Sequence, residues 1–352
     1  MFIFYILILF VALVGIRPRL TEEEKNTYLS KNSTNAIKGI FIMTVFLRHG
    51  NQYVSKSGYD YTTLMDKLFV VTDSMLGQLI VVMFLFFSGY GVMVAIQKKG
   101  ETYVKNIPKH RVFNTLINFD IAVTFFFIVA LLVGRSFTWT QVLLSFVGWE
   151  GLGNSNWYIF VILACYLSTW LSFLCVLNTK VEYQNRGGVI VNTFIIFIVV
   201  TLLYRAGKQQ WWYNTILCYP LGMYYALHKS KIERYVRKKY VYSLFLVCSI
   251  VLFFLSFIPL NMIDVQATFW GGYIVRVFSM IFFILLLMMK FKIENAFIIW
   301  MGANLFPLYI YQRLPMILIS TFLTCNPYFL FLTSFVITCA IVPIYKKNQI
   351  KI

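Results

Sequence analysis

The stretch with the clearest chemical potential is KGIFIMTVFLRHG, from Lys38 to Gly50, where an apolar run ends in an arginine and a histidine. Lys38 and His49 are eleven positions apart. At about 100° per residue, this separation is about 20° from three full turns, so on a helix the two side chains share one face, about 16 Å apart along the axis. Histidine is the side chain best suited to general base catalysis near neutral pH. The spacing therefore predicts a helix face that joins a cation to a catalytic imidazole.

A structural interpretation of the same residues is also open. Lys38 could be an anchor whose ammonium reaches the membrane surface along its apolar stem. Arg48 and His49 could mark a helix end in the membrane interface. Ionisable residues inside a membrane are costly, however, and are functional candidates by default.

The elements that must position these residues are indicated by composition. Of the 352 residues, 60% are hydrophobic and only 12% are charged, and the mean hydropathy is +0.74. A soluble domain carries about twice this charged fraction, and lipid requires every backbone polar group to be paired within the protein. We therefore expect an all-α, polytopic membrane protein with about 10–11 transmembrane helices. The apolar segments lie near residues 2–16, 38–50, 76–96, 113–134, 156–177, 188–204, 212–228, 241–259, 270–289, 297–323 and 327–345.

The N-terminal segment shows no signal-peptide pattern, and the cysteines show no disulfide or metal-binding pattern. Met1–Ile16 lacks a basic leader and a small-residue cleavage site, so we expect a retained first helix. The six cysteines have no CxxC pair and no metal-ligand spacing to the three histidines. We therefore expect packing thiols, with no disulfide framework, no metal site and no permanently bound cofactor. These cysteines are Cys165, Cys175, Cys218, Cys248, Cys325 and Cys339.

The distribution of positive charge predicts the orientation in the membrane. If the first loop is cytoplasmic, the cytoplasmic segments hold 23 Lys and Arg residues and the outside segments hold 5. Under the positive-inside rule, this places the N-terminus outside and the C-terminus in the cytoplasm. It also accounts for the net charge of +18 without a nucleic-acid partner. The expected cytoplasmic segments are 17–38, 97–111, 178–188, 229–239, 290–292 and 346–351.

The longest expected outside loops are 50–75 and 135–155. The second is rich in aromatic residues and glycine. Tryptophans are common at membrane interfaces, which is one interpretation of this loop. A platform on which a sugar stacks is the other.

Four further motifs carry a resemblance to a known family. Phe86-Phe87-Ser88-Gly89-Tyr90 is followed by a basic segment around Pro108. NWYIFVILACYL begins at Asn156, and MGANLFPLYIYQRLPM begins at Met301. Together with Lys38-x10-His49, their order resembles acyltransferase family 3, whose pattern is basic-x10-His, then FFxxSGF, then a basic cytoplasmic segment. These are integral membrane acyltransferases that modify glycans and other acceptors.

The resemblance covers roughly residues 30–345, with departures. Lysine stands where arginine is commoner, the FFxSG spacing is one residue shorter, and Gln312 followed by Arg313 replaces a C-terminal histidine. The resemblance implies three parts: an extra N-terminal helix and cytoplasmic linker (1–30), a membrane acyltransferase domain (31–346) and a short cytoplasmic tail (347–352).

The resemblance also implies roles for individual residues. Acyl-CoA would be the co-substrate, and its phosphates suit a basic inner mouth. His49 would deprotonate an acceptor hydroxyl or carry the acyl group transiently. Ser88 would be a packing or orienting residue rather than a nucleophile. The expected phosphate contacts are Lys38, Lys105, Lys109 and Arg111, and the candidates for acceptor or carbonyl contacts are Arg48, Arg276, Arg313 and Ser88.

Two classes of function are weighed on these observations. The first is an O-acyltransferase, most naturally an acetyltransferase, that acts on a surface or secreted polysaccharide or its lipid-linked precursor. The second is a polysaccharide flippase or polymerase without acyl transfer. A polymerase would carry a large outer loop with several arginines, and a transporter would show repeat symmetry, and neither is present in the sequence. We expect the only other partner to be membrane lipid.

Overall fold

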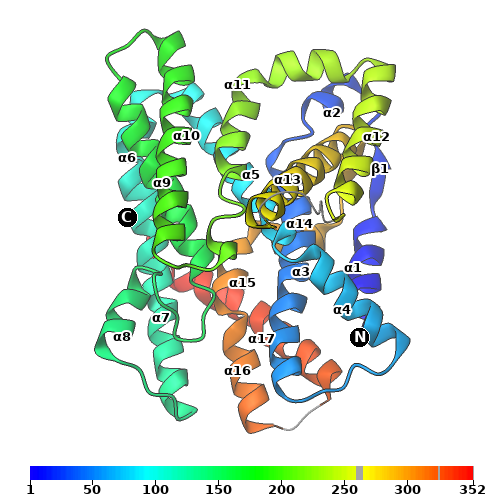
Figure 1. Cartoon of the computed structure of the whole chain (residues 1–352), viewed down its shortest axis with the longest axis vertical. Helices are drawn as coiled ribbons and strands as arrows, with labels where there is room; N and C mark the ends of the chain where they lie inside the picture. Colours follow the sequence, from blue (N-terminus) through cyan, green and yellow to red (C-terminus); the bar gives the residue numbers. More distant parts are fainter. Residues whose placement is uncertain (259–264, 324–325, 352) are drawn as a thin grey trace.

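The computed structural model describes residues 1–258, 265–323 and 326–351, and in these ranges the chain is almost entirely helical (Figure 1). The α-helices are α1 (Ile3–Leu13), α2 (Glu22–Asn26), α3 (Lys31–Lys56), α4 (Leu64–Leu76), α5 (Leu79–Lys99), α6 (Glu101–Ile107), α7 (Asn114–Leu132), α8 (Trp139–Phe146), α9 (Trp157–Val176), α10 (Val181–Arg205), α11 (Cys218–Val236), α12 (Lys239–Leu255), α13 (Val265–Lys290), α14 (Ala296–Ala303), α15 (Leu305–Tyr311), α16 (Arg313–Phe322) and α17 (Pro327–Asn348). The remaining elements are the π-helix η1 (Pro108–Phe113), the 3-10 helix η2 (Gln210–Trp212) and the short strands β1 (Ile16–Pro18) and β2 (Phe291–Ile293).

The expected polytopic helical membrane protein is confirmed. Six stretches of the described chain are long and apolar enough to cross a membrane. A seventh is obtained if α11 and α12, which meet at a bend of 113°, count as one span.

This number is smaller than that of the apolar segments in the sequence, for physical reasons. α1 has only 11 residues, too few to span a bilayer alone. Residues 297–323 are divided among the three short helices α14, α15 and α16. α3 has the length of a span, with 26 residues, but it carries ionisable side chains along its whole length.

α3 extends well beyond the apolar segment 38–50 from which it was predicted. It begins after Ser30, whose hydroxyl caps the helix by accepting a hydrogen bond from the Ser33 N–H. It continues through polar residues to Lys56. At 1.5 Å per residue, 26 residues reach about 39 Å, enough to cross a membrane.

Glycines allow the helices around the site to approach closely. A methyl group on Gly39 of α3 would lie 2.0 Å from the Ile298 carbonyl oxygen of α14. A methyl group on Gly89 of α5 would lie 1.9 Å from the Tyr219 carbonyl oxygen of α11. Backbones can come this near only where no Cβ intervenes, as at small-residue contacts between membrane helices. The glycine of the FFSGY motif thus fixes α5 against α11.

The segment before residue 31 is tied to the rest of the molecule. β1 pairs antiparallel with β2. Arg17 Nε donates to Glu294 at 2.8 Å, and Arg17 Nη2 donates to Glu24 at 2.5 Å. These hydrogen bonds lower the pKa of both carboxyl groups to about 2. Buried Arg19 donates to the carbonyl oxygen of Met288, which adds a further link to α13.

Figure 1 shows α6, α7, α9 and α10 grouped on one side of the molecule, with α3 and α1 on the other.

Several segments expected as loops contain helices. Most of α4 lies within residues 50–75, and α8 lies within 135–155. The basic segment 97–111 is largely α6 and η1, and 229–239 is largely the end of α11. Capping explains two of these helices. Thr63 and Thr138 each accept a hydrogen bond from the backbone of the first turn, which starts α4 and α8 within polar surroundings.

Of the six cysteines, five lie in the described ranges, and all five are free. Cys165 and Cys218 are buried, whereas Cys175 and Cys248 are exposed on the helix surface. Cys325 lies outside the described residues.

Candidate active site

Two pockets lie near the two ends of α3. The first, the Lys38 pocket, is a cavity of about 360 Å³ at the start of the helix. The second, the His49 pocket, has a volume of about 670 Å³ and lies near the other end. The helical spacing predicted from the sequence therefore corresponds to two separate cavities that one helix connects.

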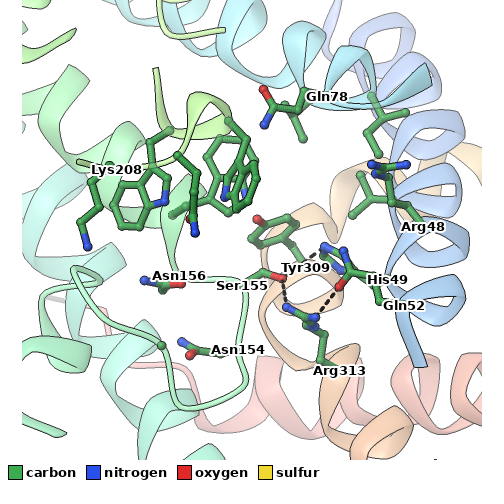
Figure 2. A pocket seen from close by; sticks show the side chains of 18 of the residues that line it. Arg48, His49, Gln52, Gln78, Asn154, Ser155, Asn156, Lys208, Tyr309 and Arg313 are labelled. Atoms are coloured by element: carbon green, nitrogen blue, oxygen red, sulfur yellow. Dashed lines mark hydrogen bonds between the residues drawn. The ribbon is translucent and has the colours of Figure 1, made fainter. Parts of the chain in front are cut away.

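The centre of the His49 pocket is a bonded group of three side chains (Figure 2). Ser155 Oγ lies 3.2 Å from His49 Nε2. Arg313 Nη1 donates to the same oxygen at 3.3 Å, and Arg313 Nη2 donates to Gln52 at 2.5 Å. His49 is only 9% exposed, and its Nδ1 is buried without a hydrogen-bond partner among the described residues. The imidazole thus has one nitrogen held by a hydroxyl and one without a bond to the described residues.

The Arg48 guanidinium is held by a carboxylate. Its Nη1 donates to the Asp73 carboxylate at 2.9 Å and to the Asp73 carbonyl oxygen at 2.7 Å. Asn51 Nδ2 donates to the same carboxylate at 2.9 Å. Arg313, by contrast, bonds only to the neutral oxygens of Ser155 and Gln52. Arg313 is therefore the cation beside His49 whose charge is not compensated by a carboxylate among the described residues.

Indole rings and Lys208 form the opposite wall of the His49 pocket, as Figure 2 shows. The Lys208 ammonium lies 4.1 Å from the ring centroid of Trp149 and 4.6 Å from that of Trp212. It also forms an ion pair with Glu150 at 3.3 Å. Lys208 is thus neutralised by Glu150 and held in place by the two indole rings. Trp211 also lines the pocket and is 42% exposed.

The Lys38 pocket is lined by cations and by hydroxyl groups. Lys38 is half-buried there, and Lys31 lies at the edge. Arg111 enters from η1, and its Nε donates to the Tyr103 hydroxyl at 3.1 Å. The Arg111 guanidinium also lies 5.9 Å from the ring centroid of Tyr166. Within the described ranges, neither Lys38 nor Arg111 has an acidic partner, so both charges are available to an anionic ligand.

The comparison with known families assigns the chain to one family. The family model described as an acyltransferase domain, that of acyltransferase family 3, matches residues 31–345, nearly the whole chain. The chain belongs to acyltransferase family 3. It is therefore a membrane acyltransferase that transfers groups other than amino-acyl groups. No curated protein and no solved structure matches it.

The predicted site residues of this acyltransferase fall into two groups. Lys38, Ser88 and Arg111 meet in the Lys38 pocket. Arg48, His49 and Arg313 meet in the His49 pocket. Helix α3 supplies lining residues to both pockets. Because Lys38 and His49 are eleven positions apart, they lie on the same face of α3 and point into one pocket each.

Three predicted residues lie away from both pockets of the acyltransferase. Lys105 is exposed and forms an ion pair with Glu101 at 2.6 Å on the same face of α6. Lys109 is exposed at the start of η1. Arg276 on α13 donates to the Ser256 carbonyl oxygen at 2.7 Å. Lys109 and Arg111 are two positions apart and so point to nearly opposite sides of a helix. Arg111 lines the pocket, while Lys109 faces outward.

An aromatic septum separates the two pockets of the acyltransferase. Phe84 lines the Lys38 pocket and packs edge-on against Tyr158, with 6.1 Å between ring centroids. Tyr158 packs on Tyr309 at 5.2 Å, and Tyr309 lines the His49 pocket and packs on the His49 ring at 6.1 Å. All three septum residues are buried. A group that passes from one pocket to the other must displace this septum.

Sequence reasoning missed Ser155, Asp73 and Lys208. Ser155 lies within the outside loop that was singled out for its aromatic residues, but a serine among asparagines carries no local signal. Asp73 lies in α4, a segment expected to be a loop. An acidic residue in the largely apolar stretch MDKLFVVTDSML is the one signal that could have suggested a partner for Arg48. Within the described part of the chain, no three His, Cys, Asp or Glu side chains are placed to hold a metal ion.

Proposed function

We propose that the protein is an O-acetyltransferase that moves an acetyl group from cytoplasmic acetyl-CoA to a hydroxyl of a surface or secreted polysaccharide. The observation that carries this proposal is the pair of pockets on α3. One pocket offers uncompensated cations, and the other offers a buried imidazole beside an uncompensated guanidinium. This division suits a donor and an acceptor that come from opposite sides of a membrane.

The charge distribution supports the assignment of sides. The Lys38 pocket is lined in part by residues of 17–38 and by Arg111 of 97–111, two segments rich in Lys and Arg. The His49 pocket is built in part from residues 149–157 and 206–212, two poorly basic segments. The positive-inside rule therefore favours the Lys38 pocket as the cytoplasmic one.

Acetyl-CoA suits the Lys38 pocket chemically. CoA carries a diphosphate and a 3′-phosphate. Lys31, Lys38 and Arg111 offer ammonium and guanidinium groups without acidic partners among the described residues. Arginine and lysine bind phosphate oxygens through charge-assisted hydrogen bonds. With the phosphates held there, the thioester arm points along α3 toward the septum.

A glycan suits the His49 pocket. The exposed face of Trp211 can stack on a sugar ring. Buried Asn154 accepts a hydrogen bond from the Leu152 N–H through Oδ1, which leaves its Nδ2 without a partner. Gln78 lines the same pocket with an unpartnered Oε1. One free donor and one free acceptor match a sugar hydroxyl, which can both accept and donate.

The chemistry proposed here uses His49 as the base. A neutral imidazole removes the proton of the attacking hydroxyl as its oxygen adds to the thioester carbonyl. Arg313 lies close enough to stabilise the negative charge that develops on the carbonyl oxygen. The septum of Phe84, Tyr158 and Tyr309 must open for the thioester to reach the base and the acceptor hydroxyl.

The test is transfer of labelled acetyl from acetyl-CoA in membranes that contain the wild-type protein or His49→Ala. The label should appear in the glycan fraction with the wild type. Loss of the base should lower transfer by about 10²–10⁴-fold. His110→Ala and His228→Ala are matched controls, since both histidines are exposed and line neither pocket. Equal labelling by wild type and His49→Ala, or no labelling by the wild type, would refute the proposed function.

A further inference from the structure

We propose that Ser155 is the nucleophile that carries the acyl group between donor and acceptor. The inference rests on the proposed function and adds a covalent intermediate to it. Within the described ranges, Ser155 is the one serine or threonine whose hydroxyl bonds to a histidine ring. A nucleophile and a base within hydrogen-bond reach are the signature of covalent acyl transfer.

The Ser155 hydroxyl lies among three polar groups. Arg313 can only donate, so its hydrogen bond at 3.3 Å occupies a lone pair of Oγ. The other two groups are His49 Nε2, at 3.2 Å, and the Tyr309 hydroxyl. In the tautomer that carries the imidazole proton on Nδ1, Nε2 can accept the proton of the Ser155 hydroxyl. This is the arrangement in which His49 can take the serine proton during attack.

The surroundings of Ser155 favour negative charge on oxygen. The Arg313 guanidinium next to Oγ stabilises an alkoxide. Ser155 also lies two residues before Trp157, where α9 begins without a side-chain cap. The first N–H groups of this 20-residue helix are thus not bonded by a capping side chain, and they form the positive end of its dipole. Both features can stabilise the oxyanion of a tetrahedral intermediate.

The reaction balances as two half-reactions. In the first, Ser155 Oγ adds to the thioester carbonyl, its proton passes to His49, the C–S bond breaks, and CoA leaves as the thiol with the proton that His49 returns. In the second, an acceptor hydroxyl adds to the serine ester, and its proton passes to His49. The ester C–O bond then breaks, and His49 returns the proton to Ser155. No oxidant, reductant or further reactant is needed.

A serine ester would also explain the septum between the two pockets. Ser155 lines the His49 pocket but not the Lys38 pocket. Once the acyl group is on Ser155, CoA can withdraw and the aromatic septum can close. CoA and the glycan then never occupy the His49 pocket together. Ser88, the other serine at the site, lines only the Lys38 pocket and has no histidine beside it.

The experiment uses the purified full-length protein, acetyl-CoA as the probe and no acceptor. We expect a burst of CoA release equal to one per protein molecule, and one acetyl group on the peptide that contains Ser155, located by mass spectrometry. Ser155→Ala and His49→Gln should lose the burst and the adduct, whereas Ser155→Thr, which keeps a hydroxyl, should retain both at a lower rate. Ser57→Ala, at an exposed serine that lines neither pocket, should keep the adduct on Ser155.

Folding of Ser155→Ala is checked by its elution from size-exclusion chromatography next to the wild type. If this variant does not fold, the wild-type burst and the adduct position still decide the question. Acetyl on His49 instead of Ser155 overturns the inference. So does CoA release that occurs only when acceptor is present, in a preparation that labels glycan. In both cases transfer itself continues, so the proposed function survives while the covalent intermediate does not.

Discussion

At the residue scale, the surroundings of two arginines beside His49 assign them different tasks. The Asp73 carboxylate compensates the charge of Arg48, and the Asp73 carbonyl oxygen accepts a second hydrogen bond from it. Arg48 therefore mainly joins α3 to α4. Arg313 bonds to neutral oxygens and keeps its full charge for the reacting group. A cation with a preorganised direction and no counter-ion is what stabilises a transient oxyanion. The chemistry therefore depends more on Arg313 than on its equally charged neighbour.

The acceptor side can be tested at Trp211. Trp211→Ala removes the exposed indole face in the His49 pocket, and stacking of one ring is worth about 1–1.5 kcal/mol. We expect the KM for glycan to rise about tenfold while the KM for acetyl-CoA is unchanged, as measured by initial rates of transfer. Trp139→Ala is the control, because Trp139 is 82% exposed and lines neither pocket. Equal effects of the two substitutions would remove the case for stacking.

The donor side separates Arg111 from Lys105. Arg111→Ala removes a guanidinium from the Lys38 pocket, and one charge-assisted hydrogen bond is worth about 1.5–3 kcal/mol. The KM for acetyl-CoA should rise by about one to two orders of magnitude. Lys105→Ala should leave it unchanged, because Lys105 pairs with Glu101 on the surface. Both are measured by varying acetyl-CoA at fixed acceptor. A larger effect at Lys105 would show that CoA phosphates bind on the surface of α6.

At the element scale, α3 and α5 carry the site because their neighbours lie unusually close. Backbone contacts at Gly39 and Gly89 fix α3 to α14 and α5 to α11. Arg111 of η1 enters the Lys38 pocket between them. These helices position the Lys38 pocket, whereas Ser155 enters the His49 pocket from the loop before α9.

Gly89→Ala tests the close contact of α5 with α11. The added methyl group would lie 1.9 Å from the Tyr219 carbonyl oxygen, so the helices must separate. Overpacking of this kind costs about 1–3 kcal/mol, and we expect a lower midpoint of thermal unfolding in detergent. Gly91→Ala is the matched control two residues along, since its methyl group would meet no atom within 4 Å. Unchanged stability of Gly89→Ala would show that the two helices do not depend on this approach.

At the scale of the whole molecule, the two-sided arrangement requires one orientation in the membrane. The segment 229–239 comprises the C-terminal end of α11 and the bend into α12, and it holds 6 of the Lys and Arg residues. The Lys38 pocket and this segment should both face the cytoplasm. The turn after α3, at Ser57 and Gly58, should face the outside together with the His49 pocket.

Cysteine labelling can check this orientation in a variant that lacks the native cysteines. A cysteine in place of Lys231 should react with a membrane-impermeant maleimide only after the cells are permeabilised. A cysteine in place of Ser57 should react in intact cells. The reverse pattern would place the His49 pocket in the cytoplasm and contradict the assignment of donor and acceptor sides.

The sequence by itself determined the class of protein, the family and the approximate place of His49. Hydrophobic runs predict membrane helices because lipid offers the backbone N–H and C=O groups no hydrogen-bond partners, and a helix pairs them internally. The eleven-residue spacing reports a shared helix face because the helical repeat is fixed. These are local properties, so they can be read along one segment.

Only the tertiary structure decided which distant residues meet. Ser155 and Arg313 reach His49 from loops and helices more than 100 positions away. Whether Lys109 or Arg111 enters the pocket depends on which side of their helix packs against α9 and the pocket. The septum exists because Phe84, Tyr158 and Tyr309 converge from three helices. Such contacts result from how the helices pack, and the packing is set by all their facing side chains together.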